Sequence, residues 1–339
     1  MILDILFIHP GNRSLIYQGL GERLSAVATP VWCGMMATYA RDRGLNVAIL
    51  DAEAEDLNPH EVAERVASMK PALVAVVVYG HQPNASTQNM TMAGRICRAL
   101  NDRSDAYTIL VGGHVSVLWE RTMLEEASDF ASRGEGIVTV AALGAALRAH
   151  GDGFDRTKVP GLVWMDKVTV RSNPPPPLVR DVPRIAFDLL DARHYRSHNS
   201  QVWVDGDGAS RTPYASLYTS LGCPFGCTFC PIQAPFKDGR PAASDGSNAY
   251  RLQPVETVVS QIDWLVEHWG VRVIRFDDEM FGLNQKWLHE LCDKLAKRPY
   301  VRDLNLWAYA RIDQGLDEEA LDRLQRAGFR WLCYGIESA

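Results

Sequence analysis

The feature that most constrains the fold of this chain is a regular alternation of short β-rich runs and longer amphipathic segments. In the first 150 residues the short runs have the length and composition of buried strands, and the segments between them carry apolar residues at helical spacing. We expect strands over 4–8, 46–50, 73–78 and 107–111, and helices over 32–43, 59–69, 86–100 and 120–127. This order predicts an α/β fold with a doubly wound parallel sheet, which binds ligands outside the carboxyl ends of its strands.

A proline-rich stretch separates this region from a second one with the same alternation. The segment 161–170 predicts a short hairpin, and the prolines at 174–177 cannot join a sheet. Beyond them, strands are expected over 214–220, 271–276, 304–309 and 331–336, with helices over 254–268, 286–297 and 317–327. The predicted parts are a Rossmann-like domain (1–150), a hairpin and Pro-rich connector (151–205), and part of a parallel (β/α) barrel (206–339).

Composition and charge exclude several classes of protein. The 339 residues are 47% hydrophobic and 22% charged, which is typical of globular domains. The formal net charge of -6 argues against a nucleic-acid partner. The longest apolar stretch, 73–78, is far shorter than the roughly 20 residues of a membrane span, and Asp4 interrupts the apolar N-terminus, so neither a membrane segment nor a signal peptide is expected. We therefore predict a cytoplasmic protein.

Three of the seven cysteines, Cys223, Cys227 and Cys230, fall within eight residues, directly after the first strand of the second region. In a reducing compartment such a cluster favours a metal or redox site over a disulfide. Three thiolates suit an iron–sulfur cluster, and a four-iron cluster with only three protein ligands leaves one iron open to a small molecule. The alternatives are a zinc site with a fourth ligand from elsewhere and a chance grouping of core cysteines. The other four cysteines are interpreted as apolar core residues.

The triad with an aromatic residue before its third cysteine, Cys-Thr-Phe-Cys at 227–230, resembles the signature of the radical S-adenosylmethionine (SAM) superfamily. Further segments resemble motifs of the same proteins in the same order. In the barrel these are the acidic turn at 276–281, Arg-Ile-Asp at 311–313 and Gly-Ile-Glu-Ser at 335–338. Upstream they are the glycine motifs at 111–114 and 133–136 of a cobalamin (B12)-binding domain, and the connector formed by the Pro run and 185–191.

The resemblance implies a set of cofactors and ligands. In this superfamily the open iron of a [4Fe–4S] cluster binds SAM, and an electron cleaves SAM to methionine and a 5′-deoxyadenosyl radical. By this resemblance the three cysteines ligate iron. The other implied contacts are Phe229 near the adenosine, Glu337 on the ribose, Arg311 on the carboxylate and Asp278 in the acidic turn. Ordinary ion pairs at strand ends are the alternative for Arg311, Asp278 and Glu337.

The resemblance also implies cobalamin in the first domain. The Asp-x-His-x-x-Gly signature of a histidine ligand to cobalt is absent around His9, but many relatives lack it, so its absence does not exclude cobalamin. Gly112 and Gly113 would let a nucleotide tail approach the backbone. His81 and His114, at predicted strand ends, are expected to be loop or hydrogen-bonding histidines rather than cobalt ligands.

The leading hypothesis is an enzyme, a cobalamin-dependent radical SAM methyltransferase that acts on an unactivated carbon of a small-molecule substrate and receives electrons from a donor such as flavodoxin or ferredoxin. The alternatives are a radical SAM enzyme of another outcome (cyclisation, rearrangement or methylthiolation) without bound cobalamin, and a non-catalytic iron–sulfur or zinc-binding fragment. Partial barrels of this superfamily normally have six strands, and the sequence stops at Ala339 after the fourth strand motif. We therefore expect a truncated barrel and an incomplete enzyme.

Overall fold

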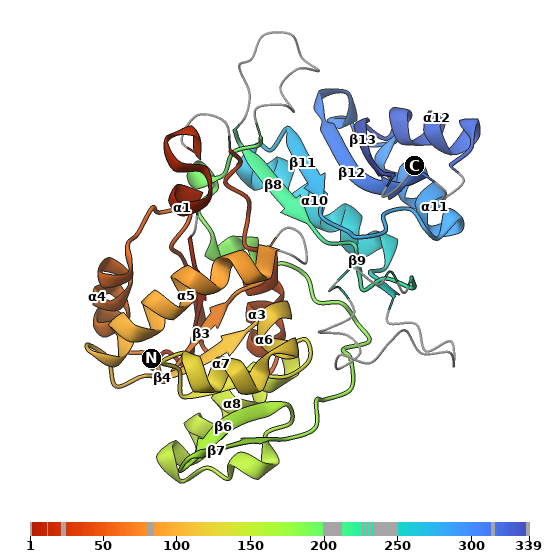
Figure 1. The fold of residues 1–339 in the computed structure, drawn as a ribbon. Coiled ribbons are helices and arrows are strands. Elements are labelled where there is room, and N and C mark those ends of the chain that lie inside the picture. The colour runs from red at the N-terminus through yellow and green to blue at the C-terminus, as the bar shows by residue number, and fades with distance from the viewer. Residues whose placement is uncertain are drawn as a thin grey trace. The chain divides into compact units, whose positions relative to one another are not determined.

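The computed structural model describes residues 2–11, 13–21, 25–80, 85–198, 212–225, 227, 230, 232, 250–312 and 316–336. The chain forms two compact units, which we describe separately (Figure 1). Unit 1 comprises Met1–Gln18, Trp32–Leu190 and Pro224–Ala249, and unit 2 comprises Gly19–Val31, Asp191–Cys223 and Tyr250–Ala339.

Unit 1 is built on one seven-stranded sheet with the strand order β2-β1-β3-β4-β5-β6-β7. The first five strands are parallel, and β6 and β7 add an antiparallel hairpin at one edge. The strands are β1 (Ile5–His9), β2 (Val47–Asp51), β3 (Leu73–Val77), β4 (Tyr107–Val111), β5 (Phe130–Ser132), β6 (Leu162–Asp166) and β7 (Thr169–Ser172).

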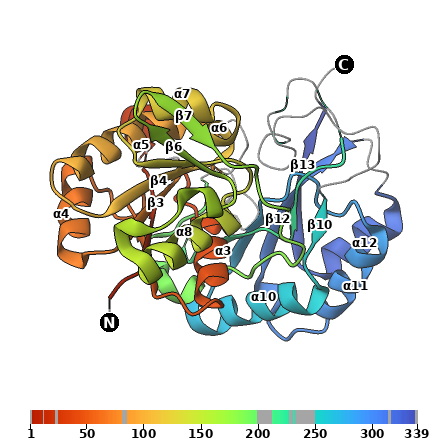
Figure 2. The ribbon, with the colours of Figure 1, turned by 90° about the horizontal axis from the view of Figure 1, so that it is seen from below.

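Helices cover both faces of this sheet, as Figure 2 shows with α3 and α8 on one side and α5, α6 and α7 on the other. The helices of unit 1 are α1 (Arg13–Tyr17), α3 (Val31–Arg41), α4 (Pro59–Met69), α5 (Ala85–Asn101), α6 (Gly113–Val117), α7 (Trp119–Glu125) and α8 (Ile137–His150). Strands β1 and β3 are buried along their whole length, which is expected of parallel strands covered on both faces. The predicted doubly wound α/β fold is confirmed.

The residues around the N-terminus of helix α4 determine where this helix begins. Asn58 accepts hydrogen bonds from the backbone N–H groups of His60 and Glu61, and the Glu61 carboxylate accepts one from the N–H of Asn58 at 2.8 Å. Pro59 occupies the first turn, where its missing N–H is harmless. These contacts complete a capping box, and they explain why the helix begins where the sequence predicted.

Unit 2 is built on a four-stranded parallel sheet with the order β13-β12-β11-β8, so the strands are neighbours in chain order, as in a (β/α) barrel. Its elements include a short antiparallel ladder formed by β9 and β10. They are β8 (Tyr214–Leu217), β9 (Ser220–Leu221), β10 (Arg251–Leu252), α10 (Val255–Trp269), β11 (Val273–Phe276), α11 (Gln285–Leu295), β12 (Asn305–Arg311), α12 (Glu318–Arg326) and β13 (Phe329–Gly335).

Two segments differ from the division expected from sequence. The hairpin of β6 and β7 extends the sheet of unit 1 instead of standing in a connector, because β6 pairs with β5. Residues 19–31 lie in unit 2: Val27 pairs with Arg196, and the Thr29 hydroxyl accepts from the N–H of Ser216 at 2.9 Å and donates to its carbonyl at 3.2 Å. Thr29 thus hydrogen-bonds the backbone N–H and carbonyl of Ser216, on the edge of β8 that pairs with no strand of the described sheet.

Among the described residues, no helix has the length and apolar content that crossing a membrane requires.

Candidate functional site

The carboxyl ends of β1 and β2 are joined by a buried ion pair. His9 and Asp51 face each other in register, with His9 Nδ1 3.0 Å from Asp51 Oδ1, and Asp51 also accepts from the N–H of Ala54 at 3.1 Å. Burial alone would lower the pKa of His9, but the charge and hydrogen bond of Asp51 outweigh it, so the pKa is raised. One ring nitrogen of His9 is therefore committed to tying the two strand ends together.

The two predicted cobalamin-binding glycines follow β4 and differ in their surroundings. A Cβ on Gly112 would lie 2.5 Å from Cγ2 and 3.0 Å from the carbonyl oxygen of Val78, so the close approach of the neighbouring strand already requires glycine there. At Gly113 the nearest atoms, from Ser86, would lie 3.7 Å away, and the residue is partly exposed. Gly113 is thus the glycine whose backbone a ligand can approach.

Polar and aromatic side chains surround this glycine pair. The N–H of His114 donates to Ser86 Oγ at 3.0 Å, and its Nδ1 lies 3.1 Å from Thr87 Oγ1. Burial and the charge of Arg121 lower the pKa of His114. The hydrogen-bonding role predicted for His114 is confirmed, and His81 lies outside the described residues.

Sequence reasoning missed an aromatic stack at the end of β3. The ring of Tyr79 stacks on that of Trp32, at the start of α3, with centroids 3.8 Å apart and an interplanar angle of 10°. The Tyr79 hydroxyl donates to the carbonyl oxygen of Glu135 at 3.2 Å. Both rings are largely buried, so their packing holds the end of β3 against the start of α3.

In unit 2 the carboxyl end of β11 continues into three consecutive acidic residues with different surroundings. Asp277 pairs with Arg275, whose Nη2 donates to its Oδ2 at 3.0 Å. The guanidinium of Arg275 lies 5.9 Å from the ring centroid of Tyr214 on β8 and 5.5 Å from that of Trp307 on β12. These side chains place a buried charge pair and aromatic rings on one face of the sheet.

Asp278 turns instead to the end of β8 and is fully buried. Its carboxylate accepts from the N–H of Thr219 at 3.0 Å, from Thr219 Oγ1 at 2.8 Å and from Ser220 Oγ at 2.5 Å. Burial raises the pKa of Asp278 to about 6, although these hydrogen bonds lower it. The described contacts of this carboxylate are therefore with the protein itself.

Glu279 is a candidate that sequence reasoning missed. Its Oε1 accepts from the hydroxyl of Tyr218 at 3.4 Å, and its Oε2 is buried without a hydrogen-bond partner among the described residues. Burial raises its pKa to about 8, and the charges of Asp278 and Asp277 contribute. The one available signal was its place as the third acid of the turn. A buried carboxylate oxygen with no partner suits a cationic or hydrogen-donating ligand.

The segment that carries the three cysteines begins at Gly222, which has a φ of +84°, and at the buried Cys223, the last residue of this part of unit 2. Cys227 and Cys230 are partly exposed, and the N–H of Cys230 donates to the carbonyl of Cys227 at 3.2 Å. Soft thiolate ligands at this close spacing suit iron. In the described part of the chain no three potential ligands are close enough to hold a metal ion, so convergence of the thiolates stays a prediction.

Other predicted residues have mixed outcomes. Arg311 ends β12 and is partly exposed, whereas Phe229 and Glu337 lie outside the described residues. Cys33, Cys97 and Cys292 are buried, as predicted. The prediction for Cys333 is wrong: its side chain is exposed, because β13 is an edge strand of the described sheet.

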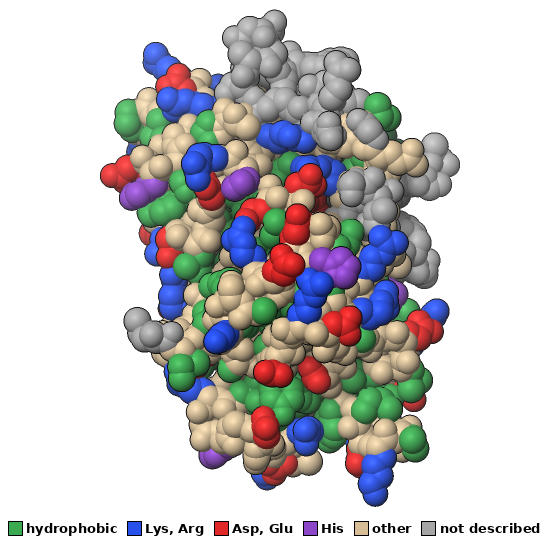
Figure 3. Space-filling view, turned by 90° about the vertical axis from the view of Figure 1, so that its left-hand side faces the viewer, with side chains coloured by type: hydrophobic (Ala, Val, Ile, Leu, Met, Phe, Trp, Pro, Cys, Tyr) green, Lys and Arg blue, Asp and Glu red, His purple; other side chains and the backbone are tan. Residues whose placement is uncertain are grey.

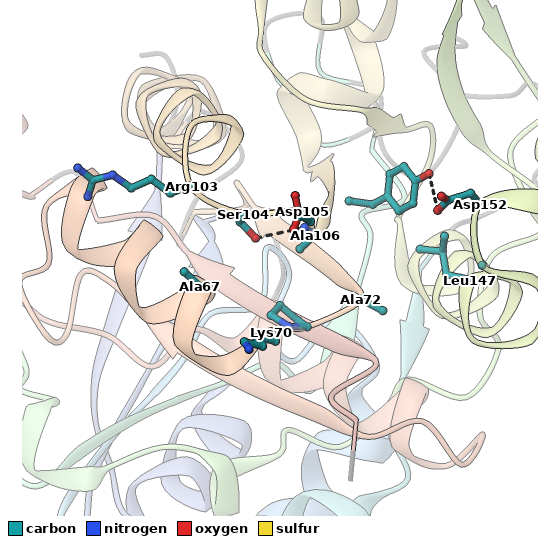
Figure 4. Close-up of a pocket in the computed structure, with 12 residues that line it drawn as sticks. Ala67, Lys70, Ala72, Arg103, Ser104, Asp105, Ala106, Leu147 and Asp152 are labelled. Carbon is teal, nitrogen blue, oxygen red and sulfur yellow. Dashed lines mark hydrogen bonds between the residues drawn. The ribbon is translucent and has the colours of Figure 1, made fainter.

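A hollow of about 480 Å³ lies at the opposite edge of the unit 1 sheet, beside Ala72 and Ala106, which immediately precede β3 and β4. Figure 4 shows Asp152 and Leu147 on one side of it and Ser104 and Arg103 on the other. A second hollow, of about 330 Å³, is lined by residues of α10 and α11 together with Lys297 and Arg298. Neither includes the predicted site residues.

Acidic and basic side chains intermingle on the face of the molecule in Figure 3. A duplex-binding surface needs a stripe of basic residues, and the described residues on this face form none. That the protein has no nucleic-acid partner stays a prediction.

Residues 17–144 match the model of the B12 binding domain. The chain is 27% identical over 343 residues to an uncharacterized methyltransferase, PH0819, of Pyrococcus horikoshii, covering 100% of this chain and 66% of the relative. It is 25% identical to an anaerobic magnesium-protoporphyrin IX monomethyl ester cyclase of Cereibacter sphaeroides, covering 99% of this chain and 51% of the cyclase.

Two solved structures share the fold. The radical SAM methyltransferase TsrM from Kitasatospora setae, with cobalamin and a [4Fe–4S] cluster bound, matches with a TM-score of 0.72 at 19% identity, over 99% of this chain and 61% of TsrM. The cobalamin-dependent SAM radical enzyme OxsB, with aqua-cobalamin and SAM bound, matches with a TM-score of 0.66 at 17% identity, over 98% of this chain and 44% of OxsB. The chain thus spans about half to two thirds of the length of the curated relatives it matches.

Proposed function

We propose, from the premise that this chain is a radical SAM protein with an N-terminal B12-binding domain, that it holds a [4Fe–4S] cluster on Cys223, Cys227 and Cys230 and cleaves SAM reductively. The proposed reaction transfers a methyl group, through cobalamin, to an unactivated carbon of a small-molecule substrate. One observation carries the proposal: three closely spaced cysteines follow the first strand of a parallel (β/α) sheet, in a chain whose residues 17–144 match a B12-binding domain.

The chain's own residues bind and orient the cofactors. When bound, the cluster and SAM supply a carbon-centred radical, and cobalamin supplies a methyl carrier. In unit 1, Gly113 leaves its backbone open to a nucleotide tail. In unit 2, the buried carboxylate of Glu279 suits the ammonium group of SAM, and Arg311 at the end of β12 suits its carboxylate. Phe229 at the adenosine and Glu337 at the ribose remain part of the proposal.

A second candidate keeps the radical chemistry and changes its outcome. The relative from Cereibacter sphaeroides is named a cyclase, although it matches over 99% of this chain, so the matched region does not by itself select methyl transfer. Cyclisation, rearrangement or methylthiolation without bound cobalamin is therefore the alternative. Either reaction needs an electron donor such as flavodoxin or ferredoxin.

The test begins with anaerobic reconstitution of the full chain with iron and sulfide. We expect broad visible absorption and about four irons per chain, both lost when the three cysteines are changed to alanine together. Reduction in the presence of SAM should then release 5′-deoxyadenosine. One bound zinc and no iron would contradict the proposal and support a non-catalytic zinc module. Failure to retain cobalamin while the cluster is loaded would remove the methyl-transfer part and favour the second candidate.

A further inference from the structure

The acidic turn after β11 contacts both ends of the segment that carries the three cysteines. This segment leaves the described fold after β9 and returns at Tyr250, directly before β10. Strands β9 and β10 pair with each other, with Leu221 opposite Arg251 and Ser220 opposite Leu252. The two ends of the cysteine segment are therefore held side by side in one two-residue ladder.

A two-residue ladder is marginally stable by itself, and side chains reinforce it. On the outgoing side, the buried carboxylate of Asp278 accepts three hydrogen bonds from Thr219 and Ser220, which lie four and three residues before Cys223, respectively. Hydrogen bonds to a charged acceptor are stronger than neutral ones, and here they are shielded from water.

On the returning side, the Tyr250 hydroxyl donates to the carbonyl oxygen of Met280 at 3.0 Å, two residues beyond Asp278. The N–H of Gln253 donates to the carbonyl of Thr219 at 2.8 Å, and the carbonyl of Gln253 accepts from Trp287 Nε1 at 2.7 Å. One short turn, 278–280, thus contacts both the strand that leads into the cysteine segment and the residue that ends it.

We propose that Asp278 is a positioning residue: through Thr219 and Ser220 it fixes the start of the cysteine segment and thereby the direction in which Cys223 enters the site, while Tyr250 fixes the end of the segment. This assigns Asp278 a role different from the cofactor contact expected from sequence, and leaves Glu279 as the acid of the turn that can face a ligand. The inference rests on the proposed function only in taking the cysteines as cluster ligands.

The test uses the metal-free full chain, so that it is independent of cluster assembly. Cys223 is buried, and its alkylation by iodoacetamide reports opening of the segment at its base. In D278N, which keeps the side-chain shape but sets an amide against the donors, we expect alkylation of Cys223 to accelerate at least about 10-fold, equivalent to about 1.4 kcal/mol of opening free energy. Y250F should have a smaller effect in the same direction, and D278E should restore part of the protection.

Unit 1 offers a matched control. Asp129 accepts from the N–H and the hydroxyl of Thr108, both at 2.8 Å, so D129N removes the same kind of carboxylate contact from the unit that does not contain Cys223. Alkylation of Cys223 should be unchanged in D129N. The buried Cys33 and Cys97, measured in the same digests by mass spectrometry, report the integrity of the fold.

The outcomes separate the two proposals. Acceleration confined to Cys223 in D278N, with reduced iron after reconstitution, supports both. If alkylation of Cys223 accelerates in D278N but the wild-type chain binds no iron after reconstitution, the positioning role is supported and the proposed function is contradicted. Unchanged alkylation of Cys223 in D278N, or equal acceleration at Cys33 and Cys97, would overturn the positioning role, since the first shows no restraint on the segment and the second a general loss of fold.

Discussion

The two units use the same architecture, a parallel sheet with helices, but equip it differently. In unit 1 the central strands β1 and β3 are buried and apolar, and His9 at the end of β1 pairs with Asp51 at the end of β2. In unit 2 the strands themselves carry polar side chains, with Arg275 buried within β11. The buried charge pair of unit 1 thus joins two strand ends, whereas that of unit 2 begins within a strand.

The largest expected effect tests the buried charge of unit 2. R275M leaves Asp277 buried without its cation and should lower the free energy of unfolding of unit 2 by about 3–5 kcal/mol. Hydrogen exchange measured by mass spectrometry would show faster exchange in β11 and β12 and little change in β1 and β3.

The control is R121M, which removes an exposed ion pair with Glu125 and should lower the free energy of unfolding far less than R275M does. The double variant R275M/D277L should recover stability, because it removes both charges together. Equal effects of R275M and R121M would show that the polar interior of unit 2 is not what distinguishes the two units.

The next effect separates packing from ligand access in unit 1. G112A should cost about 1–3 kcal/mol, because its Cβ would lie 2.5 Å from Val78 Cγ2. G113A has its nearest neighbours at 3.7 Å and should leave the thermal unfolding temperature almost unchanged. Cobalamin retained by both variants after gel filtration is then compared: loss in G113A alone identifies a ligand contact, and full retention in G113A would contradict one.

A pH effect distinguishes the ion pair of unit 1. Because the folded-state pKa of His9 is raised above 6.5, its contribution to stability is fully present below pH 6.5 and is lost as the pH rises through the raised value. A rise of one pH unit in this pKa corresponds to about 1.4 kcal/mol of folding free energy. Urea unfolding followed at several pH values should show this loss in the wild type and not in H9Q. An identical pH profile in H9Q would contradict the assignment.

The smallest effect compares one helix cap in each unit. Asn58 caps α4 through two backbone N–H groups within a capping box, whereas Asp317 caps α12 through the N–H of Ala320 alone, at 2.9 Å. N58A and D317A should each cost about 1 kcal/mol, with N58A the larger. Exchange rates in the first turn of each helix provide the measurement, and a larger loss in D317A would reverse the expected order.

Sequence predicted the elements whose signals are local. The strand expected over 4–8 is β1 at Ile5–His9, and the helix expected over 59–69 is α4 at the same residues. Helix α8 was missed because it is apolar around most of its circumference and shows no amphipathic period, and β5 was missed because it has three residues.

The motifs of the candidate site could be predicted from the sequence, but the role of each residue within a motif could not. Asp278 and Glu279 are adjacent acids in one motif, and nothing in their spacing tells which of them the protein uses for itself. That depends on Thr219 and Ser220, almost 60 residues away in the chain, whose hydroxyls reach Asp278 only in the folded sheet. Long-range contacts of this kind have no signature in a single sequence.

The contribution of residues 19–31 to unit 2 has a consequence for dissecting the protein. Thr29 and Ser216 are 187 residues apart, yet they share two hydrogen bonds, and Val27 pairs with Arg196. No single cut in the connector yields two intact pieces, because a fragment that starts near residue 206 leaves the edge of β8 without its cover. A separately expressed barrel fragment would therefore need the N-terminal segment supplied in trans or grafted onto it, and the two halves of this chain are best studied as one polypeptide.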